Sequence, residues 1–417
     1  AFVLRAWVLE GLFIPVRIAG SSMAETFHGP HLDLTCDDCG YHFACDLEAL
    51  DKLPTATCPN CGYRENRIAG SKLQPGDRLL INKTAYMLSA PQRWEAILFR
   101  CPAPRFGYCI KRVVGLPGET VTLRQGDVFV GSHRAKKTLD QLRRLAIPVF
   151  DASHRSSDPS LPARWMSEGS KSGWTISATA FHRQQVSRKD TTSEEWIRYR
   201  HWRSRQAGVV EQGPVSDDYG YNQTVSRQLN HVRDLFLVAE VTASGRGSLL
   251  FSIPSDGPPL RLQLDLEAGQ GEVLCSEKSV SQFSLESDAL IQGALIELAV
   301  ADNQLLLAID GESLLTFDLD DTSRTSDPIG YPEEQLDKKL WVASPVAIAA
   351  VGDLEVRFEN VKLFRDIYYT SEPGEIPIEL GEDEFYVLGD NSPISVDSRQ
   401  GVIVKAEHVF GKPLRWP

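Results

Sequence analysis

The sequence predicts a mainly β protein with more than one domain. The chain has 417 residues, more than one ordinary hydrophobic core holds. From about residue 233, short apolar runs alternate with Asp, Gly, Asn and Ser, as in an antiparallel β-sandwich. Two Cys-x-x-Cys pairs mark a small separate module nearer the start. Strand-like alternation also appears at 97–99, 121–123 and 128–130.

The composition is that of a folded protein and argues against a nucleic-acid partner. Hydrophobic residues make up 42% and charged residues 24%, and the formal net charge is -12. Phosphate binding needs a basic field, which this charge does not supply. The run 196–203 (WIRYRHWR) is aromatic and basic, but its aromatics keep no single face. We therefore expect a solvated strand face there and no nucleic acid.

Three segments far apart in the chain carry the residues of a Ser/Lys catalytic pair. They are 20–23 (GSSM), 110–119 (IKRVVGLPGE) and 389–399 (GDNSPISVDSR). A serine hydroxyl needs a base beside it, and a lysine can be that base only when neutral. Burial in an apolar pocket lowers the pKa of a lysine. Strand alternation places Lys111 on one face with Cys109 and Val113 and points Arg112 the other way.

Each segment alone is a weak signal, but the three in this order resemble type I signal peptidases. These are membrane-bound Ser/Lys proteases that remove signal peptides from exported proteins. The resemblance implies that Ser22 is the nucleophile, Lys111 the general base and Ser395 the serine that orients the lysine. The Ser22 N–H would contribute to the oxyanion hole, and catalysis needs no cofactor. The supporting positions are Gly20, Asp390, Asp397 and Arg399.

The chain departs from the family pattern at three places. Gly20 stands where many members have a hydroxyl as a second oxyanion donor. The usual Ser-Met-x-Pro-Thr becomes SMAET at 22–26, without the proline. The last motif keeps Asn391 but has Pro393 and Ile394 where polar residues are common. None of these changes removes a proton-transfer group, so we expect an active enzyme.

The resemblance implies a substrate and a location. The substrates would be signal peptides of secretory preproteins, cut after small residues of the Ala-x-Ala type and bound as an added strand. No apolar run reaches the ~18 residues needed to span a bilayer. The chain begins at Ala1 inside the apolar stretch 1–9, and the resemblance, rather than the composition, favours a membrane anchor upstream of Ala1. A short amphipathic strand or helix is the other reading of that stretch. The catalytic domain would lie on the exoplasmic side of the cell membrane.

Two other functions compete with this reading. One is a catalytically inactive cell-surface protein that binds glycan or protein on a signal-peptidase scaffold; the retained Ser22, Lys111 and Ser395 argue against it. The other is a self-cleaving repressor-type Ser/Lys protease. That family carries a DNA-binding helix-turn-helix, which is not evident in this sequence.

The cysteine module predicts a structural metal site. Its ligands would be Cys36, Cys39, Cys58 and Cys61, in two Cys-x-x-Cys pairs that are each followed by Gly-Tyr. This repeat is typical of zinc ribbons, because four thiolates at this spacing suit tetrahedral zinc and the glycine allows the turn under the metal. Disulfides or an empty module remain the alternative in an oxidising compartment. Cys45 is expected to be a spare buried thiol.

The sequence from 160 to 366 resembles concanavalin-A-like jelly-roll domains. The resemblance rests on a strand, IDGE at 309–312, a second strand, and the ending 356–364. Expected strands include 235–241, 248–253, 260–264, 294–300, 304–309 and 354–358. Such sandwiches often bind carbohydrate, but the acids Asp310, Glu312, Asp318, Asp320 and Asp321 show no catalytic spacing. A spacer or interaction domain is favoured, and a carbohydrate or protein ligand is left open.

The predicted fold is thus a signal-peptidase-type antiparallel β catalytic fold interrupted by a zinc-ribbon-like module and a large β-sandwich, or jelly-roll, insertion. A helix is expected at 136–146, ended by Pro148. The expected segments are the nucleophile part of the catalytic domain (1–29), the zinc-ribbon-like insertion (30–66), the lysine part (67–133), a helix and linker (134–159), the β-sandwich insertion (160–366) and the C-terminal catalytic part (367–417).

Overall fold

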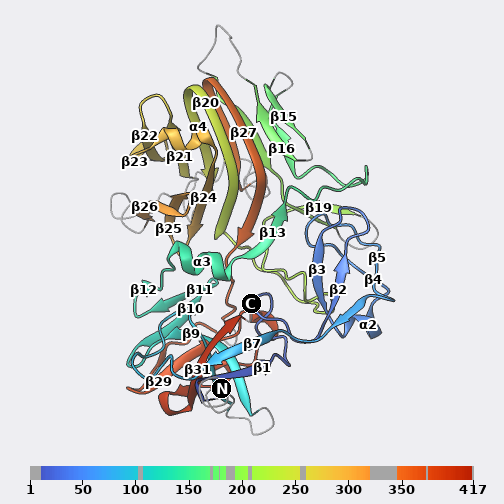
Figure 1. Ribbon diagram of the computed structural model, residues 1–417, viewed down its shortest axis with the longest axis vertical. Coiled ribbons are helices and arrows are strands. Elements are labelled where there is room, and N and C mark those ends of the chain that lie inside the picture. The colour runs from blue at the N-terminus through green and yellow to red at the C-terminus, as the bar shows by residue number, and fades with distance from the viewer. Residues whose placement is uncertain are drawn as a thin grey trace, which may run out of the picture.

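The computed structural model is mainly β (Figure 1). It describes residues 11–101, 107–169, 172–177, 179–184, 193–204, 209–253, 260–319, 345–371 and 374–415. The apolar stretch 1–9 lies before these residues, so the expectation of an upstream anchor falls outside them. Within the described residues, no helix has the length and apolar character needed to cross a bilayer. The short α-helices that lie between strands in the described residues are α2 (Ala49–Lys52), α3 (Leu139–Leu145) and α4 (Ser287–Gln292).

A seven-stranded antiparallel sheet is built from three separate stretches of the chain, at the lower end of Figure 1. Its order is β1-β7-β31-β8-β9-β29-β30. The strands are β1 (Phe13–Arg17), β7 (Arg78–Asn82), β8 (Ala96–Arg100), β9 (Tyr108–Gly115), β29 (Glu384–Leu388), β30 (Val404–Lys405) and β31 (Val409–Arg415). The middle position of β9 makes it a rigid support, because both of its edges are hydrogen-bonded.

A second, four-stranded sheet continues this region, and α3 follows it in the chain. The sheet contains β10 (Thr120–Arg124), β11 (Asp127–Val130), β12 (His133–Arg134) and β28 (Ile378–Glu379). Helix α3 begins after Thr138, whose side chain caps it together with Gln141. The predicted helix 136–146 is therefore present but shorter. Pro148 does not end it directly, because it lies inside the following strand β13 (Ile147–Asp151).

The cysteine module is a separate unit with its own core. Its strands are β2 (His31–Thr35), β3 (His42–Asp46), β4 (Thr55–Ala56), β5 (Asn66–Arg67) and β6 (Lys72–Gln74). Leu32, Phe43 and Ile68 are buried together with Cys36, Cys45, Cys58 and Cys61, and the partly buried Cys39 packs against them. Burial raises the pKa of Cys45 to about 12, so this thiol is inert, as expected. The core is small, and a unit of this size usually needs a metal or disulfides in addition to its core.

The β-sandwich occupies the upper end of Figure 1. Its strands are β13, β14 (Trp165–Ser167), β15 (Trp174–Ile176), β16 (Ala180–Arg183), β17 (Glu195–Tyr199), β20 (Leu235–Ile253), β21 (Leu260–Asp265), β22 (Gln270–Cys275), β23 (Lys278–Ser284), β24 (Ala294–Ala301), β25 (Gln304–Ile309), β26 (Glu312–Asp318) and β27 (Ala347–Arg365). A small hairpin of β18 (Trp202–Ser204) and β19 (Val210–Gln212) lies beside it.

Two long, paired strands run through the whole sandwich. β20 and β27 pair from Leu235 and Arg365 at one end to Ser252 and Ala347 at the other. One half of the pair carries β24 and β16, and the other half carries β21 and β17. Side chains from both halves of β20 enter the same buried core. The paired strands therefore fold over on themselves, and the two sheets face each other.

The separate strands predicted at 235–241 and 248–253 are thus one continuous strand, which corrects the sequence analysis. The glycines between them do not end the strand. Gly245 and Gly247 have φ values of 109° and 143°, and Gly352 opposite has 87°. These backbone conformations suit glycine and allow the bend.

The run 196–203 also differs from expectation. Tyr199, His201 and Trp202 are buried, with exposed fractions of 0%, 9% and 1%. Only the intervening side chains remain partly accessible. The prediction of a solvated face was therefore wrong for half of the run, because its aromatics pack into the molecule.

Candidate active site and four-cysteine site

Lys111 lies in the middle of β9 with its side chain in an apolar environment. Ile97 of β8 is directly opposite it. Ile97 and Val113 are completely buried in one hydrophobic cluster, and Cys109 packs against that cluster. Lys111 itself is only 5% exposed. The alternation of β9 thus places the amine on the apolar face that the sequence indicated.

The amine of Lys111 meets a hydroxyl. Lys111 Nζ donates a hydrogen bond of 2.9 Å to Ser395 Oγ, across 284 residues of sequence. Burial lowers the pKa of Lys111, whereas the charges of Asp397, Cys109 and Asp390 act in the opposite direction. The net shift is downward, which favours the neutral amine that a general base requires.

The backbone of Ser22 lies next to the loop that carries Ser395. It lies in a turn, and its carbonyl accepts a hydrogen bond of 3.1 Å from Asn391 N. A Cβ atom at Gly389 would lie 2.5 Å from the Ser22 carbonyl oxygen and 2.2 Å from Ser395 Oγ. Gly389 is therefore squeezed between the nucleophile segment and the serine that holds the lysine. Only glycine allows this approach.

The surroundings of Ser22 leave room for an oxyanion. Within the described residues, nothing accepts a hydrogen bond from the Ser22 N–H. A Cβ atom at Gly20 would meet nothing within 4 Å. The backbone donor is thus available, and there is space beside it where many family members carry a hydroxyl.

Asp390 is the partner of Arg112. Arg112 Nε donates to Asp390 Oδ1 at 2.7 Å, and a second guanidinium nitrogen reaches Oδ2. Both residues are buried, and Arg112 also donates to the Trp94 carbonyl at 2.7 Å. Sequence reasoning treated Arg112 only as the neighbour that points away from the site. Arg112 directly follows Lys111, so it points to the other face of a central strand, and its guanidinium is always charged. A buried guanidinium usually pairs with a carboxylate, and this was the signal that the sequence offered.

Asp397 and Arg399 form the second charged pair of the last motif. Arg399 Nε and Nη2 donate to the two oxygens of Asp397 at 2.9 and 2.8 Å. Asp397 Oδ2 also accepts from Gly389 N at 2.9 Å. Arg399 continues to the carbonyl of Ser392 at 2.8 Å. The pair therefore fixes the loop on which Ser395 lies.

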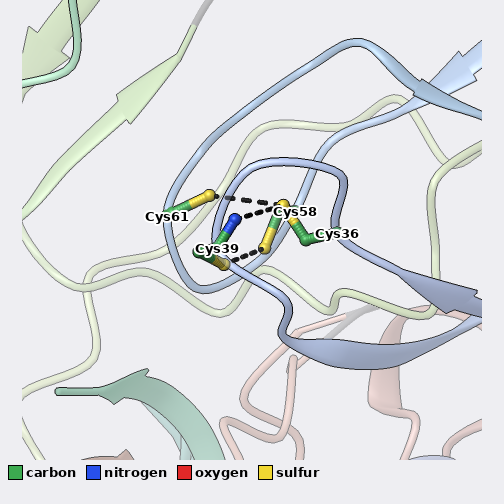
Figure 2. A group of neighbouring side chains, drawn as sticks. All are labelled: Cys36, Cys39, Cys58 and Cys61. Atoms are coloured by element: carbon green, nitrogen blue, oxygen red, sulfur yellow. Dashed lines mark hydrogen bonds between the residues drawn. The ribbon is translucent and has the colours of Figure 1, made fainter. Parts of the chain in front are cut away.

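The four predicted metal ligands converge (Figure 2). Their sulfur atoms all lie within 4.8 Å of one another. Cys36 Sγ and Cys61 Sγ are 3.6 Å apart, and Cys39 Sγ and Cys58 Sγ are 3.8 Å apart. Tetrahedral zinc with Zn–S bonds of ~2.3 Å separates its sulfurs by about 3.8 Å. The cluster can hold a metal ion, and all eight cysteines of the chain are free thiols.

The two Cys-x-x-Cys turns have the same backbone. Cys36 N donates to the Tyr41 carbonyl at 2.9 Å, and Cys58 N donates to the Tyr63 carbonyl at 2.8 Å. Gly40 and Gly62 have φ values of 72° and 77°, which permits the turn. Backbone N–H groups also point at sulfur, as in Cys39 N to Cys36 Sγ at 3.5 Å. Such donors stabilise thiolates.

The buried side chain of Arg164 lies beside the Cys58–Cys61 turn. Its positive charge suits a metal–thiolate group, which carries negative charge. Arg164 is 8% exposed, and no hydrogen-bond partner for its Nε lies among the residues that the structure describes. It stacks on Trp202 at 3.8 Å and donates to the Trp202 carbonyl at 2.6 Å. Trp202 in turn covers Gly62, where a Cβ atom would lie 2.6 Å from the ring. Four thiolates around a divalent ion leave two negative charges, and Arg164 lies where it can offset part of them.

Comparison with known proteins finds relatives for the part of the chain that contains Lys111. Residues 66–167 match the family described as "Signal peptidase, peptidase S26". The chain is 38% identical over 84 residues to "Probable signal peptidase I-2" of Synechocystis sp., covering 19% of this chain and 37% of that protein. It is 31% identical over 107 residues to "Signal peptidase I V" of Bacillus subtilis, covering 24% and 60%.

These matches make part of the chain similar to signal peptidases of peptidase family S26. It spans 37% and 60% of the length of these two curated relatives.

Two solved structures match about half of the chain at low similarity. The carbohydrate-binding module CBM66 from Bacillus subtilis matches with a TM-score of 0.29 and 10% identity, covering 48% of this chain and 96% of that chain. The exoplasmic/lumenal domain of VIP36 matches with a TM-score of 0.31 and 10% identity, covering 52% and 87%. Scores this low say nothing about a ligand.

Proposed function

We propose that this protein is a signal peptidase, a membrane-associated serine endopeptidase that cleaves signal peptides from exported preproteins after small residues. The catalytic part would lie on the exoplasmic side of the cell membrane. The observation that carries the proposal is the 2.9 Å hydrogen bond from the buried Lys111 Nζ to Ser395 Oγ. Next to this pair, Gly389 lies close to the carbonyl of Ser22.

The proposed reaction passes one proton between two side chains. Neutral Lys111 removes the proton from Ser22 Oγ, which attacks the peptide carbonyl, and the Ser22 N–H donates to the oxyanion. When the tetrahedral intermediate collapses, the Lys111 ammonium returns the proton to the leaving amine. Water then attacks the acyl-enzyme with Lys111 again as base. Ser395 keeps the amine oriented throughout because it accepts one of its hydrogens.

The test is cleavage of a synthetic Ala-x-Ala signal peptide by the purified chain. Ser22→Ala and Lys111→Ala should each lower the rate by at least about 10⁴-fold. Ser132→Ala and Lys405→Met are matched controls, because both residues are exposed and lie away from the site. Cleavage that survives either site change would overturn the mechanism. A chain that is folded but inert would favour the cell-surface binding protein.

We further infer that the four-cysteine cluster holds structural zinc. The sulfur spacing, the paired turns and the buried Arg164 support this. With four cysteine ligands the metal has no open position, so its chemistry is stabilisation of the ribbon. Metal analysis of the purified chain should find about one zinc per molecule. Finding none under reducing conditions would reject the assignment.

A further inference from the structure

A short stretch at 219–223 (YGYNQ) lies between the cysteine module and the active site. It belongs to the connection between β19 and β20, inside the region predicted as the β-sandwich insertion. We call these five residues the strap. The signal peptidase motifs lie elsewhere in the chain, so the strap is a feature that the resemblance did not explain.

One side of the strap is bound to the cysteine module. Thr57 N donates to Gln223 Oε1 at 3.0 Å, and Gln223 Nε2 donates back to the Thr57 carbonyl at 3.1 Å. Asp46 N donates to the Tyr221 carbonyl at 2.9 Å. A Cβ atom at Gly220 would lie 2.8 Å from the Pro59 ring, so the contact is close. The cysteine module therefore holds the strap at Gly220, Tyr221 and Gln223.

The other side holds the start of the last catalytic motif. The Tyr219 hydroxyl donates to the Asp390 carbonyl at 2.7 Å. Asn222 Nδ2 donates to Asn391 Oδ1 at 2.7 Å, and Asn391 Nδ2 donates to Asn222 Oδ1 at 2.9 Å. Asn222 is 8% exposed and Asn391 0%, so this amide pair is isolated from water. Breaking it would leave buried polar groups without partners.

Asn391 connects the pair to the nucleophile. Its second Nδ2 hydrogen goes to the Ser21 carbonyl at 3.1 Å, and its backbone N–H goes to the Ser22 carbonyl at 3.1 Å. If the Asn391 amide turned over, its oxygen would face the carbonyl oxygen of Ser21. The Ser21 carbonyl therefore fixes which end of the amide donates to the nucleophile segment, and the two hydrogen bonds with Asn222 hold the amide in place.

We propose that Asn222 is a positioning residue for the nucleophile, acting through Asn391 on the backbone of Ser21 and Ser22. This rests on the proposed peptidase function for its effect on rate, but not for its effect on structure. A misplacement of ~1 Å at a reacting atom can cost ~10²-fold in rate. Loss of the amide pair should therefore lower kcat by about 10- to 100-fold and change KM by less than about twofold.

The experiment combines peptide cleavage with hydrogen exchange at residues 18–27. Asn222→Ala should lower kcat and speed exchange in this stretch by about tenfold or more, because Ser21 and Ser22 lose an oriented donor. Asn222→Asp keeps the oxygen that accepts from Asn391 and should fall between the wild type and Asn222→Ala. Asn230→Ala is the matched control: its side chain donates to Asp217 within the same connection and does not touch the motif. It should change neither readout.

A double variant tests the route. If Asn222 acts through Asn391, then Asn222→Ala combined with Asn391→Ala should be no slower than Asn391→Ala alone. Fully additive effects would overturn the proposal. Unchanged exchange at 18–27 in Asn222→Ala would also overturn it, whatever the activity. Faster exchange in a chain that cleaves no peptide would instead support the positioning role and reject the peptidase function. Should Asn222→Ala not fold, Asn222→Asp carries the same two readouts.

Discussion

Two buried lysines of this molecule have opposite properties. Lys111 and Lys137 are 5% and 4% exposed, so burial does not distinguish them. Lys111 Nζ meets the hydroxyl of Ser395, whereas Lys137 Nζ lies 2.8 Å from Asp302 and 2.7 Å from Asp366. Burial alone would lower the pKa of Lys137, but the two carboxylates outweigh it and raise the pKa well above its usual value. The pKa of Lys111 is lowered.

The difference lies in how the nearby carboxylates are occupied. Lys111 also has two of them close by, Asp390 and Asp397. Each is already paired with an arginine, Arg112 or Arg399. The lysine is thus left with a neutral partner. Burial is the main cause of the lowered pKa of Lys111, and pairing the carboxylates with arginines limits the opposite effect of their charges.

Replacing Lys111 gives the largest expected effect. Lys111→Met should remove activity by about 10⁴-fold, because no base remains for Ser22. The same change should raise the melting temperature at pH 7. The folded state lowers the pKa of this amine, so the amine opposes folding at every pH below its unfolded value of about 10.4. Calorimetry checks this. A lower melting temperature would mean that Lys111 is a structural cation like Lys137.

Replacing Lys137 should have the reverse effect. Lys137→Met leaves Asp302 and Asp366 buried without their cation, and the free energy of unfolding should fall by about 3–5 kcal/mol. Urea unfolding measures this, with Lys405→Met as the exposed control. The specific activity of the folded fraction should stay unchanged. The raised pKa also means that the contribution of Lys137 is complete below pH ~10.4 and is lost only above it.

Arg164 extends the comparison to a third buried cation. Within the described residues, its hydrogen bonds go to backbone carbonyls and none goes to a carboxylate. Arg164→Leu should weaken zinc retention by about 10- to 100-fold in competition with a chelator, because the charge beside the thiolates is lost. Arg155→Leu is the control, since it also donates to backbone carbonyls but elsewhere. Equal retention in both variants would leave Arg164 as a packing residue.

The smallest expected effect is a shift of the pH profile. Arg399→Gln frees the charge of Asp397, which raises the pKa of Lys111. The rise of kcat/KM with pH should then move to higher pH, because the base form of the lysine is reached later. Arg399→Lys keeps a positive charge there and should shift the profile less. A profile that moves to lower pH would contradict the account of how Lys111 stays neutral.

Several parts of this arrangement followed from local patterns. Strand alternation gave the face of Lys111, and the repeated Cys-x-x-Cys-Gly-Tyr gave the convergence of the four sulfurs. Other parts depend on contacts that no local pattern encodes. Arg112 finds Asp390 across 278 residues, and Asn222 finds Asn391 across 169. The bend of β20 at Gly245 and Gly247 depends on its partner β27 having Gly352 opposite.

The 284-residue separation between Lys111 and Ser395 has a consequence for biosynthesis. A growing chain exposes its serine and its lysine long before the ribosome has made the loop that orients the amine. Until that loop has been made and has packed, the Lys111 amine remains hydrated and protonated. The proposed peptidase activity therefore cannot begin before translation has passed Ser395.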